Sequence, residues 1–359
     1  MKIKIAFLIG VLGGGGAERV IANLSSTFAE HDYDTTVITF QRMEEEYKLS
    51  PLVKRINLNE NGICHGIKTK LKNQIAIRKI CRQETFDVLV SFMMGANYHA
   101  VAATLFTKTK TIISVRNDPR QEYFGRVNSF IAKLFLPFAN GCVFQTEDAM
   151  NWFPVRLRKK STIIFNPINK AFYDINPDLS GHIVMTSGRL EPQKNHEMLI
   201  SVFKEILTVI PDAKLHIYGV GRLQDKLQDQ ILNLDMSDSV CLCGYVSDMP
   251  NKLKQATIFV LTSDFEGMPN ALMEAMAAGI PCVAIDCPCG GVKVVLQNGE
   301  YGVLVAPRDR EAVRDALINL LTDEKYRAEL SKRSKTRAQY FNSESVFTQW
   351  ESYIEKLLS

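Results

Sequence analysis

Two acidic residues, Glu266 and Glu274, stand on either side of a helix start, where they could bind the hydroxyl groups of carbohydrates. Pro269 suits the first helical position, because its fixed φ fits there and its missing N–H is not needed. Gly279 followed by Pro281 is expected to end the helix. Glu266 then lies in the loop before the helix and Glu274 inside it. Since a carboxylate accepts two hydrogen bonds, the pair could hold a sugar and a ribose.

The same helix start offers backbone N–H groups that suit an anion such as a diphosphate. These donors belong to Gly267, Met268 and Asn270. Alternatively, Glu266 only offsets the helix dipole. That alternative leaves Glu274 unexplained, because its neighbours in the helix are apolar and a carboxylate there needs a partner.

A second segment, residues 188–195 (GRLEPQKN), carries two cations between an expected strand and an expected helix. Lys194 lies near the helix start, where a positive charge is unfavourable unless an anion is bound. Arg189 could grip the same anion with two parallel hydrogen bonds. The simpler alternative is that both are solvated loop charges.

Four glycines at positions 13–16 follow the first expected strand and open a helix. Such a loop lets the backbone approach an anion, and it also suits a tight turn. A dinucleotide fingerprint needs a third glycine where Glu18 or Arg19 stands, and an acidic residue that is missing from positions 35–41. No lysine of a P-loop follows. These differences argue against a dehydrogenase.

The composition indicates a globular protein of two domains. The 359 residues are 46% hydrophobic and 23% charged, which excludes a disordered, collagen-like or coiled-coil chain. The apolar start of the chain resembles a signal peptide, but its run into glycines favours a strand. The eight cysteines show no metal-binding spacing, so we expect free thiols and a cytoplasmic location.

Positive charge is concentrated in the first half of the chain. Residues 1–170 carry 24 Lys and Arg against 14 Asp and Glu, whereas residues 171–359 carry 19 against 25. This asymmetry indicates two domains with different partners, the first of which faces something anionic.

Strands alternate with helices along both halves, which predicts an α/β protein with two Rossmann-like doubly wound domains facing across a cleft. The expected strands of the first half are 3–9, 35–40, 88–92, 111–115 and 141–145. Those of the second are 183–187, 214–218, 240–242, 258–261, 281–285 and 302–305. We expect domains at 1–168 and 181–339, and a final helix, 340–359, that packs back on the first domain. Ligands of such sheets bind beyond the carboxyl ends of the strands.

The chain resembles the retaining glycosyltransferases of family 4, which have the GT-B fold. The resemblance covers nearly the whole chain and is carried by GGGGAER at 13–19, GRLEPQKN at 188–195, GYVSD at 244–248 and EGMPNALMEAMAAGIPCVA at 266–284. It implies that Arg189 and Lys194 hold the diphosphate of a nucleotide-sugar donor, that Glu274 holds the ribose, and that Tyr245 and Val246 border the base. The donor sugar would be held by Glu266, Gly267, Met268, Pro269 and Asn270, and Gly15 and Gly16 would approach the phosphate or the acceptor.

The resemblance also implies a mechanism and one departure from the family pattern. Transfer would retain the anomeric configuration through front-face attack, with Glu266, Arg189 and Lys194 as the catalytic residues and electrostatic stabilisation of the departing diphosphate as the main contribution. No cofactor and no metal are expected. Many relatives carry a histidine where Arg116 stands here, and Arg116 could instead contact a phosphate or the donor sugar.

Residues 68–82 (KTKLKNQIAIRKICR) are predicted to form a basic amphipathic helix that suits an anionic membrane surface. By resemblance to bacterial transferases that extend glycans on a polyprenyl diphosphate, Lys68, Lys72, Arg78 and Lys79, with Arg116, would bind the acceptor's diphosphate. Residues 130–138 (FIAKLFLPF) could enter lipid or form a core helix. A solvated basic helix is the simpler alternative. Aromatic and basic residues are not interleaved as in nucleic-acid modules, so no nucleic-acid partner is expected.

These observations lead to one main hypothesis and one alternative. The main hypothesis is a cytoplasmic enzyme, peripheral on the inner face of the cell membrane. It would move an N-acetylhexosamine or hexose from a UDP-sugar to a lipid-linked saccharide of a surface glycan. The alternative is a non-catalytic sugar-nucleotide-binding protein on the same fold, which the joint presence of Arg189, Lys194, Glu266 and Glu274 argues against.

Overall fold

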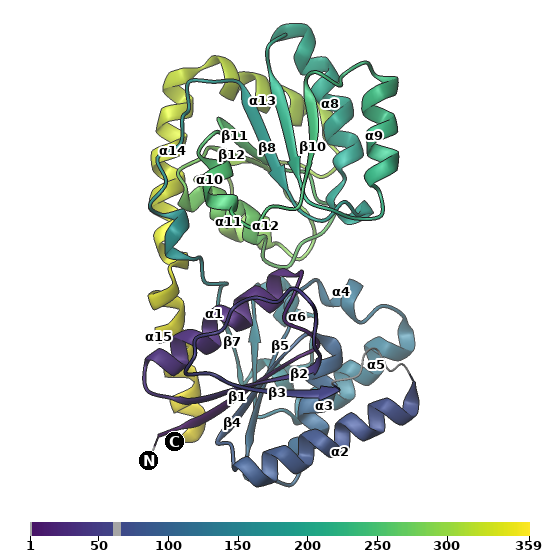
Figure 1. Cartoon of the computed structure of the whole chain (residues 1–359), viewed down its shortest axis with the longest axis vertical. Coiled ribbons are helices and arrows are strands. Elements are labelled where there is room, and N and C mark those ends of the chain that lie inside the picture. Colours follow the sequence, from purple (N-terminus) through teal and green to yellow (C-terminus); the bar gives the residue numbers. More distant parts are fainter. Residues whose placement is uncertain (1, 60–65) are drawn as a thin grey trace. The chain divides into compact units, whose positions relative to one another are not determined.

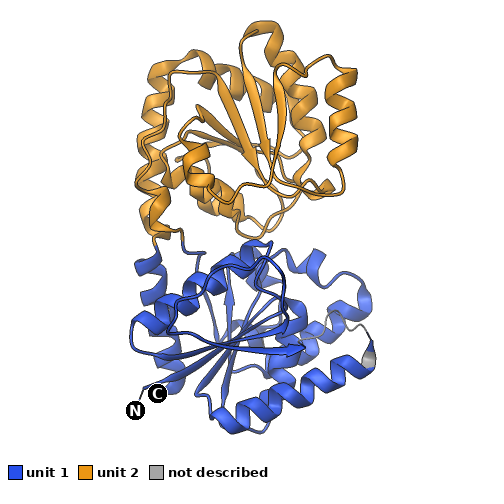
Figure 2. Ribbon diagram, viewed as in Figure 1, with its two compact units in different colours: residues 1–167, 343–359 blue, residues 168–342 orange. Residues whose placement is uncertain are grey.

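A computed structural model describes residues 2–59 and 66–359. The chain divides into two compact units (Figure 2), Met1–Pro167 with Ser343–Ser359 and Ile168–Asn342, called unit 1 and unit 2 below. Each unit is built on one parallel sheet with helices between its strands. The predicted α/β class with two doubly wound parallel sheets is therefore confirmed.

Unit 1 contains a seven-stranded sheet in the order β3-β2-β1-β4-β5-β6-β7. Every pairing in it is parallel. Its central strands are fully buried runs of apolar residues, as expected for a sheet covered on both faces. The strands are β1 (Lys4–Ile9), β2 (Asp34–Gln41), β3 (Lys54–Asn59), β4 (Val88–Phe92), β5 (Lys110–Ser114), β6 (Gly141–Phe144) and β7 (Ser161–Ile163).

Helices cover both faces of this sheet (Figure 1). The longer ones are α1 (Gly16–Glu30), α2 (Ile67–Glu84), α3 (Met94–Thr104), α5 (Arg126–Phe135) and α15 (Ser343–Leu358). The shorter ones are α4 (Pro119–Glu122), η1 (Leu136–Phe138), α6 (Glu147–Asn151) and α7 (Val155–Arg158).

Successive side chains of β1 point to opposite faces of the sheet and therefore enter two different cores. Phe7 packs with α1 and α15, where Phe28 and Phe347 meet with ring centroids 4.8 Å apart. Leu8 packs on the other side with residues of α2 and α3, among them Ile77. The C-terminal helix is thus part of unit 1.

Unit 2 contains a six-stranded parallel sheet in the order β10-β9-β8-β11-β12-β13. The strands are β8 (Ile183–Ser187), β9 (Lys214–Tyr218), β10 (Val240–Gly244), β11 (Ile258–Leu261), β12 (Cys282–Ile285) and β13 (Val303–Val305). The helices are α8 (His196–Val209), α9 (Gln224–Asn233), α10 (Met249–Leu253), α11 (Asn270–Ala277), α12 (Gly291–Val295), α13 (Arg310–Thr322) and α14 (Glu324–Ala338), with short turns η2 (Lys170–Phe172), η3 (Pro192–Lys194) and η4 (Gln339–Phe341).

Two strands that the sequence did not predict, β3 and β7, lie at the two edges of the first sheet. An edge strand is half exposed, and β3 accordingly reads KRINLN without a buried apolar run. Cys64 lies outside the described residues, and the structure describes free thiols at Cys81, Cys142, Cys241, Cys243, Cys282 and Cys287. No helix among the described residues has the length and apolar character needed to cross a bilayer.

Candidate functional site

The loops that follow β8 and β11 are bonded to each other at the carboxyl edge of the second sheet. Thr262 donates its hydroxyl to the carbonyl of Lys194 at 2.9 Å, and the Gln193 amide donates to the carbonyl of Phe265 at 2.8 Å. The backbone N–H of Asp264 in turn donates to the carbonyl of Gln193 at 2.8 Å. These bonds fix the two segments that carry the predicted donor-binding residues.

Lys194 and Glu266 form a largely buried ion pair within this pair of loops. The Nζ of Lys194 lies 2.5 Å from Oε1 of Glu266, and the two side chains are 15% and 8% exposed. Ser263 donates its hydroxyl to the same carboxylate oxygen at 2.7 Å. A carboxylate that accepts two charge-assisted or hydroxyl bonds is held in one orientation. The pair thus places a positive and a negative group together beside the start of α11.

The start of α11 differs by one residue from the sequence prediction. Pro269 is the N-cap, and Asn270 is the first helical residue. A proline side chain has no acceptor atom, so Pro269 itself cannot satisfy the N–H groups of the first turn. Gly279 has φ +77° and follows the C-cap, as predicted.

A glycine that the sequence analysis missed keeps this helix tip in place. A methyl group at Gly291 would collide with the carbonyl oxygen of Gly267. The loop after β12 therefore packs with its backbone directly against the segment Gly267–Met268, which is buried. The short link Gly290–Gly291 was a visible sequence signal for such a close approach.

Glu274 lies inside α11 and is only 5% exposed. It is not without a partner. Glu274 thus lies inside α11, and the Lys194–Glu266 pair lies just before the start of the same helix. This agrees with the predicted positions of both glutamates along the chain.

Three further predicted donor residues follow strands β8 and β10 of the same sheet, which are separated by β9. Arg189 is exposed directly after β8, and Tyr245, 62% exposed, and Val246 directly follow β10. The loops after β8 and β9 approach closely, because a methyl group at Gly219 would collide with the carbonyl oxygen of Gly188. Since carboxyl ends of parallel strands share one edge, all of these groups lie along one side of unit 2.

His196, which the sequence analysis did not single out, is the first residue of α8 and is 2% exposed. Burial, and then the nearby cation of Lys194, lowers the pKa of His196 to about 4. The imidazole is therefore neutral at physiological pH and adds no further positive charge beside Lys194.

The glycine loop of unit 1 holds a carboxylate of its own. Gly15 is the N-cap of α1, and a methyl group there would collide with the carboxylate of Glu18. Glu18 thus folds back over the helix tip formed by Gly15 and Gly16, where a negative charge is favourable. A methyl group at Gly13 would collide with the carbonyl oxygen of Glu45. Close packing against the backbone therefore accounts for Gly13, whereas the contact at Gly15 is with the end of a flexible side chain.

Arg116, directly after β5, is a buried cation. It is 8% exposed, and its guanidinium lies 4.0 Å from the ring centroid of Phe92. None of its three side-chain nitrogens has a hydrogen-bond partner among the described residues. Burial lowers the pKa of Arg116 to about 9. A buried charge without a hydrogen-bonded partner is costly, and among the described residues the ring of Phe92 is the contact recorded for this guanidinium.

Glu122, also missed from the sequence, lies near the same edge of unit 1. Its Oε1 accepts the backbone N–H of Met94 at 2.6 Å, at the start of α3. Burial raises the pKa of Glu122 to about 7, although the bond from Met94 opposes that shift.

The four basic residues predicted on α2 do not share one environment. Arg78 donates to the carbonyls of Ala102, Ala103 and Leu105 at 3.1 to 3.4 Å and so satisfies the end of α3. Its structural role was not predicted. Lys68, Lys72 and Lys79 are exposed. They line a shallow hollow of about 480 Å³ together with Leu71, Ile75 and Ala76.

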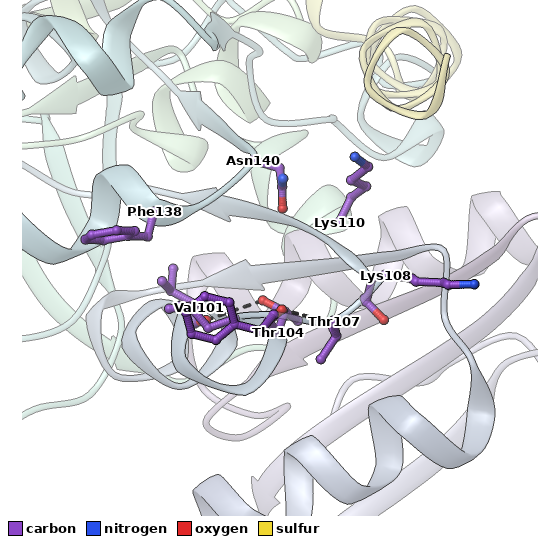
Figure 3. Close-up of a pocket in the computed structure, with 10 residues that line it drawn as sticks. Val101, Thr104, Thr107, Lys108, Lys110, Phe138 and Asn140 are labelled. Carbon is purple, nitrogen blue, oxygen red and sulfur yellow. Dashed lines mark hydrogen bonds between the residues drawn. The ribbon is translucent and has the colours of Figure 1, made fainter.

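A second hollow, of about 430 Å³, lies beside the amino-terminal end of β5 (Figure 3). Thr104, Lys108, Lys110 and Phe138 line it, and no predicted site residue does so among the described residues. Ligands of doubly wound sheets bind at the carboxyl edge, so this hollow is not the candidate site. No group of three metal-ligating side chains occurs in the described part of the chain.

Two family models match consecutive parts of the chain. Residues 14–172 match the model described as "Glycosyltransferase Family 4", and residues 169–337 match the model described as "Glycosyl transferases group 1". Together they span the candidate site and the glycine loop.

Two full-length relatives come from Campylobacter jejuni. One is 27% identical over 99% of both chains and is named a GalNAc-α-(1->4)-GalNAc-α-(1->3)-diNAcBac-PP-undecaprenol α-1,4-N-acetyl-D-galactosaminyltransferase. The other is 28% identical over 96% of this chain and 97% of its own, and is named an N-acetylgalactosamine-N,N'-diacetylbacillosaminyl-diphospho-undecaprenol 4-α-N-acetylgalactosaminyltransferase.

Solved structures share the fold at low identity. HepE of Anabaena, in complex with UDP and glucose, superposes with a TM-score of 0.82 at 18% identity, covering 99% of this chain and all of its own. A TarM mutant of S. aureus, in complex with UDP among other ligands, gives 0.80 at 15% identity over the same shares.

Proposed function

The chain belongs to the glycosyltransferases of the GT-B fold, and from this premise we propose the reaction that it catalyses. It moves an N-acetylhexosamine or hexose from a UDP-sugar to a glycan carried on a polyprenyl diphosphate, with retention at the anomeric carbon. The observation that carries this proposal is the Lys194–Glu266 pair, fixed by two bonded loops at the tip of α11.

The donor diphosphate lies, in this proposal, against Arg189, Lys194 and the backbone N–H groups of Gly267, Met268 and Asn270. Cations and helix-tip amides are the two donor types that proteins use for phosphate. The HepE and TarM structures, which share this fold, are complexes with UDP, and this supports a UDP-linked donor. Tyr245 and Val246 then border the base.

The two carboxylates hold the carbohydrate rings of the donor. Glu266 accepts hydrogen bonds from hydroxyl groups of the sugar, and the backbone N–H groups around Pro269 donate hydrogen bonds to it. Glu274 holds the ribose. Ser263 and Lys194 keep the Glu266 carboxylate in one orientation. A preoriented carboxylate binds the sugar without the cost of ordering its side chain.

Departure of the diphosphate is the step that the cations accelerate. As the bond between the anomeric carbon and the phosphate oxygen breaks, negative charge grows on the leaving group beside Arg189 and Lys194. Fixed cations stabilise this charge more in the transition state than in the ground state. The acceptor hydroxyl attacks from the same face, and the leaving phosphate takes its proton.

The acceptor is proposed from the names of the relatives. Both Campylobacter proteins are named for undecaprenyl-diphosphate-linked glycans. On this chain Lys68, Lys72 and Lys79, with Arg116, supply unit 1 with cations for a lipid-linked diphosphate, and Gly15 and Gly16 border the acceptor. Arg78 is not assigned to the acceptor, because its guanidinium is hydrogen-bonded to carbonyl groups at the end of α3. An acceptor of this kind places the enzyme on the inner face of the cell membrane.

Mass spectrometry of lipid-linked products tests this function. The full chain is incubated with undecaprenyl-diphosphate-linked saccharides and, one at a time, with UDP- and GDP-sugars. We expect one added sugar residue or more from a UDP-sugar, and an α linkage by NMR from an α-linked donor. Binding of UDP-sugars without any transfer would identify a non-catalytic binding protein instead, and a β linkage would contradict retention.

A further inference from the structure

Helix α5 presents its apolar side to solvent. Val127, Phe130, Ile131 and Leu134 are 70%, 67%, 44% and 62% exposed. At 100° per residue these four positions lie on one side of the helix. A surface helix of a globular protein normally turns such a side inward, so α5 is inverted with respect to the usual pattern.

The opposite side of α5 attaches it to unit 1. Ala132 is fully buried, and Ser129 donates its hydroxyl to the carbonyl of Tyr123 at 2.9 Å. Phe135 meets Tyr98 of α3 with ring centroids 6.0 Å apart. These contacts leave Val127, Phe130, Ile131 and Leu134 on the solvent side of the helix.

Two aromatic side chains next to α5 continue the exposed apolar surface. Phe124, in the turn before the helix, is 76% exposed, and Phe138, in η1 after it, is 48% exposed. We call these two residues and Val127, Phe130, Ile131 and Leu134 the α5 face. Isolated exposed hydrophobic residues are ordinary, whereas six on one short segment indicate an interaction surface.

The charged residues of the segment from Phe124 to Gln145, which contains α5, are all positive. No acidic residue occurs between Tyr123 and Thr146, whereas Arg126 and Lys133 lie on α5 itself. Lys133 lies 4.3 Å from the ring centroid of Trp152, and the guanidinium of Arg156 lies 4.9 Å from that of Phe138. Apolar side chains surrounded by cations complement an anionic lipid surface.

We propose that the α5 face inserts into the interfacial region of an anionic bilayer. The apolar side chains enter the acyl boundary, while Arg126, Lys133 and Arg156 contact lipid headgroups. This inference rests on the proposed function only in that a lipid-linked acceptor requires an enzyme at the membrane. It assigns the insertion to α5, separately from the lysines of α2.

The charge pattern favours lipid over a second copy of the chain. A symmetry-related copy would bring the same cations, Arg126 and Lys133, close to one another. Stable membrane attachment generally needs two signals, such as an apolar insertion and a basic patch. The exposed lysines of α2 supply a basic patch on the same unit. Helix α2 packs on α3, and Phe135 of α5 also contacts α3.

Co-sedimentation of the full chain with vesicles tests the proposal. The vesicles contain either phosphatidylcholine alone or phosphatidylcholine with phosphatidylglycerol. We expect binding to the anionic vesicles, and at least about a tenfold loss of partitioning in Phe130→Glu and Leu134→Glu. Leu232→Glu is the matched control, because Leu232 is 57% exposed on a helix of unit 2; it should bind as the parent does.

Depth of insertion is measured with a fluorescent reporter. The fluorescence of the Phe130→Trp variant should be quenched by brominated lipids more than that of the parent chain, whose own Trp152 lies beside α5, and Leu232→Trp should show no such increase. Unchanged vesicle binding of the two Glu variants, or no added quenching in Phe130→Trp, would overturn the proposal. An oligomer in gel filtration that Leu134→Glu dissociates would do so as well, since the face would then join two copies.

A water-soluble acceptor separates this proposal from the proposed function. With a diphosphate-linked saccharide on a short alkyl chain, Phe130→Glu should transfer sugar as fast as the parent chain. Loss of that transfer in the folded variant would contradict a purely membrane-binding role. Vesicle binding that depends on α5 in a chain with no transferase activity would leave the α5 proposal standing and reject the proposed reaction.

Discussion

Lys194 and Glu266 are joined at 2.5 Å although they are far apart in the sequence, and Ser263 shares the same carboxylate oxygen. The pair gives the tip of α11 a cation that is already in position and a carboxylate that is already oriented. Neither group has to be recruited when a diphosphate and a sugar bind. This arrangement connects the order of the strands in unit 2 to the proposed chemistry, because each residue is supplied by a different strand-to-helix loop.

Lys194→Ala should lower turnover at least about a hundredfold, since one fixed donor to developing charge contributes that much in comparable sites. It should also lower the unfolding free energy of unit 2 by about 1–3 kcal/mol, because the buried Glu266 carboxylate loses its cation and keeps only the hydroxyl of Ser263. Turnover of UDP-sugar and chemical denaturation measure the two effects. Lys226→Ala removes an exposed ion pair with Glu197 in the same unit and should change neither; activity of Lys194→Ala near that control would remove Lys194 from the mechanism.

Gly291→Ala should displace the segment that carries the donor amides, because the new methyl group meets the carbonyl of Gly267. We expect weaker UDP binding by calorimetry and a loss of about 1–3 kcal/mol in the stability of unit 2. Gly181→Ala adds a methyl group at ordinary contact distance, 3.6 Å from Thr257, and serves as the control. Equal UDP affinity of the two variants would show that the close approach does not shape the site.

Arg116→Met should separate binding from stability. Replacing a buried, unpaired cation by an apolar side chain of similar length is expected to leave stability unchanged or to raise it by on the order of 1 kcal/mol. Transfer to a lipid-linked acceptor should fall at least about tenfold if a substrate anion is the partner of Arg116. A variant that is destabilised yet fully active would assign Arg116 to packing on Phe92 instead.

Arg78 and Lys79 are neighbours on α2 with different expected roles. Arg78→Met removes three hydrogen bonds to carbonyls at the end of α3 and should cost about 1–3 kcal/mol of stability. Lys79→Met alters an exposed residue and should stay within about 0.5 kcal/mol of the parent, while weakening retention on anionic vesicles. Urea titration followed by circular dichroism measures the stabilities, and a reversed order would contradict these assignments.

Glu122 should make unit 1 less stable as the pH rises. Its pKa is raised by burial from 4.5 to about 7, so the folded state binds the proton more tightly than the unfolded state. The stabilisation from the proton on Glu122 is fully present below about pH 4.5 and is lost as the pH rises through about 7. The unfolding free energy should fall by about 3 kcal/mol at most. Denaturation at a series of pH values should show this decline in the parent chain, and Glu122→Gln should abolish it. An identical pH profile in both proteins would exclude Glu122 as its source.

The buried central strands and both edge strands of the second sheet could be predicted from sequence, whereas the two edge strands of the first sheet could not. Strand β8 was predicted with its observed bounds, because a run of buried apolar residues flanked by glycines has few alternatives. Strand β3 was missed because an edge strand needs no such run. Among the site residues, the positions of Glu266 and Glu274 about the start of α11 followed from proline and glycine signals that act locally.

Contacts between segments that are distant along the chain could not be predicted from the sequence. The pairing of Lys194 with Glu266 depends on β8 and β11 being neighbours in the sheet. The role of Arg78 depends on where α3 ends in space, which the residue pattern of α2 does not indicate. Glu122 escaped notice because only its burial, and not its neighbours along the chain, makes it unusual.

A crystal structure of the chain with bound UDP-sugar tests the central claim most directly. The account predicts that the diphosphate lies within hydrogen-bond distance of Lys194 and the amides at the tip of α11, with the sugar on Glu266 and the ribose on Glu274. A fully occupied donor that contacts none of these groups would contradict it.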